Sequence, residues 1–214
     1  MNCSVSDRHL TSVIDTAVHR VTGDIGRAAS LEARTLGQAL LFVGVLRYYK
    51  GLRVLLEAVK DTPYRLIIAG KGPEEAGLKS YLERQRITNV VMAGHVCDEE
   101  KMALLTLARA FVLPSCERSE AFGVTLLEGA MSARPLISAE VGSGTSHVNI
   151  HGETGYLTHP DDIELMSEYA ISILKDPKTL DEFKNKAFKQ SKACMVQLST
   201  PSGERENEFI QQMM

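Results

Sequence analysis

The amino-acid sequence predicts an α/β fold, a doubly wound parallel sheet with helices on both faces. Two observations predict it. Beginning near Ala39, short apolar runs of strand length alternate with longer stretches whose apolar residues recur at helical spacing. Glycine-containing turns close the first two apolar runs. Strands that alternate with helices in this rhythm form βαβ units, and these units make parallel sheets.

The first strand and helix lie between residues 40 and 60. Leu40 to Leu46 is a short, continuous apolar run that ends at a basic turn containing Gly51, as expected of a buried strand. Gly51 to Lys60 then carries Leu and Val residues at i, i+3, i+4 and i+7, which is the spacing of one helical face. These residues form the first strand–helix unit.

The same unit repeats along the chain. Tyr64 to Ala69 is predicted to be a strand, closed by the turn Gly70 to Pro73, and a charged helix follows. The further elements predicted, in order, are a strand at 89–94, a helix from 98 to about 108, a strand at 110–113, a helix from 123 to about 133, a strand at 135–138, a helix at about 166–174 and a helix beginning near 177, where Pro suits a first helical turn.

We expect one domain, at residues 31–192. Residues 1–30 show only a weak helical pattern, and residues 193–214 mix Ser, Pro, Gly and charged residues without a sustained period. Both segments are therefore predicted to be peripheral to the domain.

Composition and charge exclude several classes of function. The chain has 214 residues, of which 44% are hydrophobic and 24% charged, as in a globular protein of one large or two small domains. The formal net charge is −3 and the basic residues are scattered, which argues against a nucleic-acid-binding surface. The longest apolar run is far shorter than the ~20 residues of a membrane span, and Met1 to Arg8 lacks the apolar stretch of a secretory signal. We therefore expect a cytoplasmic protein with no membrane span.

The cysteines predict neither a disulfide nor a metal site. They stand far apart, at positions 3, 97, 116 and 194, with no C-x-x-C pair and no His at the spacing of zinc ligands. In a reducing compartment we expect free thiols without a catalytic role. A catalytic thiol would need a partner base, which sequence alone does not place.

The segment from Pro114 to Ala133 carries the strongest functional signal. It combines a strand end, a polar loop and a helix that begins at about Gly123. Ligands of open α/β sheets bind beyond the carboxyl ends of the strands, where the free N–H groups of a helix start attract phosphate. Glu128 is the only charge in this helix, so it either hydrogen-bonds a specific partner, or points outward or pairs with a neighbouring Arg. Glu120, in the loop, by itself indicates only a solvated acid.

Four motifs between Leu40 and Lys192 resemble those of the retaining glycosyltransferases of family 4 (group 1), which have the GT-B fold. They are G-x-L-x-x-x-K-G at 44–51, G-x-G-P at 70–73, the E-x7-E pair of Glu120 and Glu128, and H-G-E-T-G-Y-L at 151–157. Each motif alone is weak, but four in the right order are strong. The resemblance implies a Rossmann-like, nucleotide-sugar-binding domain, the carboxyl-terminal half of a GT-B fold.

The resemblance also implies a role for individual residues. Lys50 would hold the diphosphate of a nucleoside-diphosphate sugar, which is the substrate, and no metal or other cofactor is implied. The family usually carries Arg where this chain has Val45; Arg47 lies two positions later, on the same side of an extended chain, and could replace it. The other implied contacts are those of Gly44 with the diphosphate, Glu120 with the hydroxyls of the transferred sugar, Glu128 with the ribose hydroxyls, the amides of Phe122 and Gly123 with phosphate and sugar, and the loop at His95 and Val96 with the base.

The implied activity is retaining transfer of a hexose-like sugar in carbohydrate biosynthesis. Lys50, Arg47 and the helix start would stabilise the departing diphosphate, while Glu120 contacts the sugar. GT-B enzymes have two domains and only the donor-binding one is matched, so an acceptor-binding domain or a partner chain is expected to complete the enzyme and to make any peripheral membrane contact. The chain then corresponds to a fragment or a truncated product.

Three alternatives share the coarse fold. The first is a non-catalytic nucleotide-sugar-binding module, and the second is a sugar-nucleotide epimerase of GT-B type, over which the E-x7-E pair favours a transferase. The third, a dinucleotide oxidoreductase, is excluded because the stretch from Gly70 to Glu75 lacks the third glycine of its fingerprint. The loop at 142–147 either contacts the sugar or only connects two elements.

Overall fold

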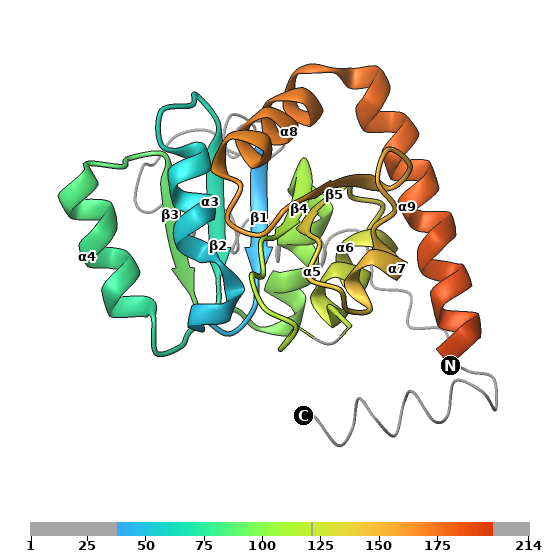
Figure 1. Cartoon of the computed structure of the whole chain (residues 1–214), viewed down its shortest axis with the longest axis horizontal. Coiled ribbons are helices and arrows are strands. Elements are labelled where there is room, and N and C mark those ends of the chain that lie inside the picture. The colour runs from blue at the N-terminus through green and yellow to red at the C-terminus, as the bar shows by residue number, and fades with distance from the viewer. Residues whose placement is uncertain (1–37, 121, 199–214) are drawn as a thin grey trace.

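The computed structural model describes residues 38–120 and 122–198. They form a six-stranded sheet in the order β3-β2-β1-β4-β5-β6, in which all neighbouring strands are parallel (Figure 1). The strand order reverses between β1 and β4, which confirms the doubly wound α/β fold predicted from the sequence. The strands are β1 (Ala39–Val43), β2 (Arg65–Ala69), β3 (Val90–Gly94), β4 (Ala110–Leu113), β5 (Leu136–Ala139) and β6 (Gly155–Thr158).

Helices cover both faces of this sheet. α3 contacts α4 and α8, whereas α6 contacts α7 and α9, so the helices fall into two groups. Figure 1 shows α3 and α8 on the face turned toward the viewer. Right-handed crossovers account for this division, because the chain moves in opposite directions from the centre of the sheet before and after β4. The helices are η1 (Tyr48–Lys50), α3 (Leu52–Val59), α4 (Glu75–Gln85), α5 (Asp98–Leu107), α6 (Val124–Met131), α7 (Thr145–Val148), α8 (Ile163–Lys175) and α9 (Pro177–Leu198).

The predicted elements are present, with three differences. The first strand ends at Val43 rather than Leu46, because Gly44 takes a φ of 158° and turns the chain into a loop. The sequence analysis does not predict β6 or the short helix α7. The last helix continues to Leu198, and Cys194 on it is buried. The predicted peripheral segments at 1–30 and 199–214 lie outside the described residues.

The core brings α6 close to the sheet. Every residue of β1, β4 and β5 is buried, and Phe111 of β4 lies under α6. A Cβ added to Gly129 would lie 2.8 Å from Cγ of Phe111, so only glycine allows this approach. The close packing fixes the position of the neighbouring residue in α6, Glu128.

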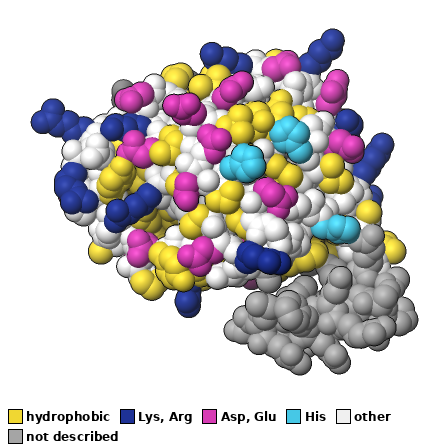
Figure 2. Space-filling model, in the orientation of Figure 1, with side chains coloured by type: hydrophobic (Ala, Val, Ile, Leu, Met, Phe, Trp, Pro, Cys, Tyr) yellow, Lys and Arg dark blue, Asp and Glu magenta, His cyan; other side chains and the backbone are white. Residues whose placement is uncertain are grey.

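The surface mixes charges of both signs. Figure 2 shows acidic and basic side chains interspersed over one face of the molecule. Within the described ranges, every helix is too short or too polar to cross a bilayer.

Candidate functional site

The candidate site lies at the carboxyl edge of the sheet, where the loops after β1, β2 and β4 meet. The backbone of the first two loops is joined directly: the amide of Leu46 donates to the carbonyl of Lys71 at 3.0 Å, and the amide of Glu74 donates to the carbonyl of Leu46 at 3.1 Å. A Cβ on Gly70 would lie 1.9 Å from the carbonyl oxygen of Gly44. These loops therefore pack backbone against backbone, which explains the glycines in both motifs.

The loop after β1 also packs on the loop after β4. Gly51 has a φ of 63°, ends the turn η1 and precedes the first residue of α3. A Cβ there would lie 2.0 Å from the carbonyl oxygen of Pro114, and the amide of Cys116 donates to the carbonyl of Tyr49 at 2.8 Å. This packing buries Lys50 at the end of η1.

Lys50 and Glu120, 70 positions apart in sequence, form an ion pair in this packed region. Only 8% of each residue is exposed. The hydroxyl of Ser115, which is fully buried, donates to the same carboxylate oxygen at 3.1 Å. Since Oε2 of Glu120 receives both bonds, its Oε1 is left for a further donor. The structure thus brings together two of the three residues predicted to be catalytic.

Arg47, the third, lies on the outside of the same loop. Val45 is 52% exposed, Leu46 is buried and Arg47 is exposed, so side chains alternate and Arg47 faces the same way as Val45. The described part of the chain contains no ion-pair partner for Arg47. Its guanidinium is therefore available to an anion, although the structure does not bring it into the buried pair.

The helix α6 begins beside this pair. Gly123 precedes it with a φ of 70°, and a Cβ there would lie 3.0 Å from Cγ2 of Thr145. No side chain caps the helix, so its first amides have no side-chain acceptor. Phe122 is half-buried against the core. A helix start without a side-chain cap is suited to an anionic ligand.

Glu128 has a partner that the sequence analysis does not predict. Nζ of Lys101, on α5, lies 2.7 Å from Oε1 of Glu128 and 3.3 Å from Oδ1 of Asp98. The hydrogen bond to Glu128 raises the pKa of Lys101. Glu128 is thus paired, but with a lysine of another helix rather than a neighbouring arginine. Lys101 gives no local signal in the sequence, because it is one charge in a charged helix.

The loop after β3 is joined to the same edge. The amide of Gly70 donates to the carbonyl of Gly94 at 2.6 Å. His95 is exposed, and Val96 packs against the core. Oε2 of Glu100 accepts the amide of Cys97 at 2.9 Å, which fixes the start of α5 directly after this loop. Whether His95 and Val96 contact a base stays a prediction.

The loop at 142–147 lies next to the start of α6. The carboxylate of Glu140 accepts the amide of Gly142 at 2.8 Å and the hydroxyl of Ser146 at 2.5 Å, so the loop is held from within. Thr145, on α7, is the residue that approaches Gly123. Its position keeps a sugar contact open, as one of the two alternatives.

The thiols do not form part of the chemistry. Cys97, Cys116 and Cys194 are free, while Cys3 lies outside the described residues. Burial raises the pKa of Cys116, the thiol nearest to the ion pair in sequence, which disfavours the nucleophilic thiolate. In the two described ranges, no group of His, Cys, Asp or Glu side chains is placed to hold a metal ion.

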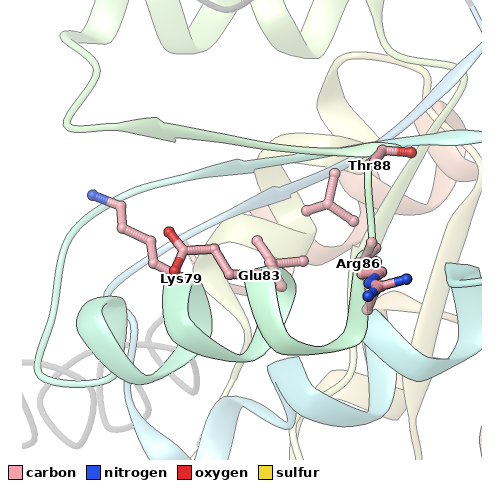
Figure 3. A pocket seen from close by; sticks show the side chains of 7 residues that line it. Lys79, Glu83, Arg86 and Thr88 are labelled. Carbon is pink, nitrogen blue, oxygen red and sulfur yellow. The ribbon is translucent and has the colours of Figure 1, made fainter.

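A separate pocket of about 290 Å³ lies between α4 and β3 (Figure 3). Lys79, Glu83 and Arg86 line it. It lies at the carboxyl end of α4 and the amino end of β3, on the edge of the sheet opposite to the loops described above. The helix dipole is negative at that end, so the pocket is poorly suited to phosphate despite its two cations.

Comparison with known proteins points to one family. Residues 29–190 match the family model "Glycosyl transferases group 1". The chain is 54% identical over 120 residues to the D-rhamnosyltransferase WbpZ of Pseudomonas aeruginosa, covering 56% of this chain and 32% of that protein. It is 40% identical over 165 residues to the O-antigen chain mannosyltransferase C of Escherichia coli, covering 77% of this chain and 44% of that protein. The chain thus spans less than half the length of either relative.

Solved structures share the fold at low sequence identity. The TarM structure of S. aureus, whose title names UDP, has a TM-score of 0.67 at 18% identity and covers 83% of this chain and 35% of that chain. The catalytic domain of the cholesterol-α-glucosyltransferase from Helicobacter pylori has a TM-score of 0.65 at 19% identity, and it covers 73% of this chain and 99% of that chain. These similarities support the GT-B-like Rossmann architecture alone.

Proposed function

We propose that this chain, which belongs to the glycosyl transferases of group 1, forms the domain of such an enzyme that binds a nucleoside-diphosphate sugar. The observation that carries the proposal is the buried pair of Lys50 and Glu120. It lies at the carboxyl edge of a doubly wound sheet, where ligands of this fold bind. Burying two charges is costly, and the same position would serve the binding of an anionic sugar donor.

Positive charge at this edge would hold the diphosphate. Lys50 supplies a buried ammonium, Arg47 an exposed guanidinium on the same loop, and the uncapped start of α6 a partial positive charge. A diphosphate that binds Lys50 competes with Glu120 for its ammonium. Release of that carboxylate would then present Glu120 to the hydroxyls of the transferred sugar.

These groups would act most strongly as the diphosphate leaves. Negative charge grows on the leaving group while the bond to the sugar breaks, and fixed cations stabilise that charge without reorganisation. An acceptor hydroxyl would attack the same face of the sugar, so its configuration would be retained. The proposal requires no metal ion, because side chains and a helix start supply the charge.

The acceptor would be bound elsewhere. The curated relatives are more than twice as long as the part that this chain matches, so an acceptor-binding domain or a partner chain is part of the proposal. The names of these relatives indicate rhamnose and mannose transfer, and UDP is named for the TarM structure. The sugar and the base are therefore left open, as is a non-catalytic binding role. The cytoplasmic location stays a prediction.

Calorimetric titration tests this proposal. UDP or GDP should bind about tenfold or more tightly than the matching monophosphate, since each charge-assisted hydrogen bond to the second phosphate contributes roughly 1.5–3 kcal/mol. NADH should compete poorly for the site. Equal affinities for UDP and UMP, and for GDP and GMP, would contradict the proposed phosphate site.

A further inference from the structure

The ion pair between α5 and α6 suggests a role that the proposed function does not assign. Lys101 reaches across from α5 to Glu128, and its Nζ lies 2.7 Å from Oε1. The side chains are 21% and 29% exposed, so water only partly screens the contact. An interaction of this kind between two helices restricts the direction in which the carboxylate points.

Lys101 is itself held in place. Its Nζ also contacts Oδ1 of Asp98, one turn earlier on α5, at 3.3 Å. The start of α5 is fixed by the bond between Cys97 and Glu100. On the other side of the pair, Gly129 holds α6 closely against Phe111. Both helices are thus anchored, and the ammonium approaches one oxygen of Glu128 only.

We infer that Lys101 is a positioning residue that orients Glu128 and thereby determines the preference of the site for ribonucleotides. The inference rests on the proposed function, in which Glu128 accepts the ribose hydroxyls. Lys101 occupies Oε1, so Oε2 remains for the ribose, and the positive charge keeps the carboxylate ionised as an acceptor. Without Lys101 the side chain of Glu128 gains rotamers, and only some of them meet the ribose.

The test compares UDP with 2′,3′-dideoxy-UDP, and GDP with 2′,3′-dideoxy-GDP, by calorimetry. The wild type should bind the ribonucleotide about tenfold or more tightly, as expected for a pair of charge-assisted hydrogen bonds. Lys101→Met should lower this ratio to about twofold, with little change in affinity for the dideoxy nucleotide. Lys101→Arg should retain most of the preference, because it keeps the charge. Glu128→Gln should reduce the ratio as Lys101→Met does.

Lys79 provides a matched control. Its Nζ also lies 2.7 Å from a glutamate, Glu75, but within α4 and away from the candidate site. Lys79→Met should leave the ribose preference unchanged. If Lys101→Met folds poorly, Lys101→Gln offers the same comparison, and thermal melting shows which variant is folded.

The outcomes separate the inference from the proposed function. A wild type that binds neither UDP nor GDP contradicts the proposed function. A wild type that prefers the ribonucleotide, with the preference lost in Glu128→Gln but kept in Lys101→Met, overturns the inference alone. A lower melting temperature in Lys101→Met with an unchanged ratio also overturns it, because the residue would then only stabilise the fold.

Discussion

Lys50→Ala should abolish measurable binding of UDP and GDP and lower the free energy of unfolding by about 3–5 kcal/mol. The change removes the proposed diphosphate ligand and leaves the carboxylate of Glu120 buried without its cation. Ser115 alone then donates to that carboxylate. Calorimetry measures the first effect and urea unfolding the second.

A double variant separates the two effects. Lys50→Met combined with Glu120→Gln removes both charges, so much of the stability should return while binding stays lost. Lys184→Ala is the control for loss of a lysine, since Lys184 pairs with Asp181 on the surface of α9 and such pairs contribute little. Unchanged nucleotide affinity in Lys50→Ala, together with lower stability, would show that the pair is only structural.

The 214-residue chain alone should bind a sugar nucleotide but transfer the sugar extremely slowly. In the proposed enzyme another domain positions the acceptor hydroxyl, and the loss of that orientation can forfeit about 7–11 kcal/mol of barrier lowering. Water also reaches an open site, so the residual reaction should be slow donor hydrolysis. A panel of UDP- and GDP-sugars, assayed for transfer and for free diphosphate, measures both reactions.

Two variants give this prediction a control. Hydrolysis should fall further in Lys50→Ala, and also in Arg47→Ala if Arg47 supplies the charge missing at Val45. The second variant is the cleaner of the two, because Arg47 is exposed and its loss should not disturb the fold. Rapid transfer to an added acceptor by the purified chain, with no partner, would contradict the half-enzyme proposal.

Much of the fold can be predicted from the sequence, because buried parallel strands and amphipathic helices leave clear patterns. The differences have local causes. The apolar run from Leu40 to Leu46 continues past the end of β1, and only the φ of Gly44 ends the strand. β6 (Gly155–Thr158) is a short edge strand of mixed residues, so periodicity does not reveal it. The extension of α9 to Leu198 lies in a segment without a clear period.

The site is less accessible to sequence reasoning. Lys50 and Glu120 are both identified through motifs, but their direct pairing depends on how two loops pack, 70 positions apart. Glu128 is conspicuous as a charge in an apolar helix, and a pairing partner is one of the two interpretations that the sequence allows. Lys101 has no such contrast with its neighbours, so only the arrangement of α5 against α6 identifies it.

Hydrogen–deuterium exchange with and without saturating UDP or GDP tests the central claim most directly. Bound nucleotide should slow amide exchange in peptides that carry Lys50, Glu120 and the first turn of α6, because these segments form the proposed diphosphate site. Peptides lining the pocket between α4 and β3 (Figure 3) should exchange as before. Slower exchange at that pocket alone, or no change at the carboxyl edge of the sheet, would contradict the account.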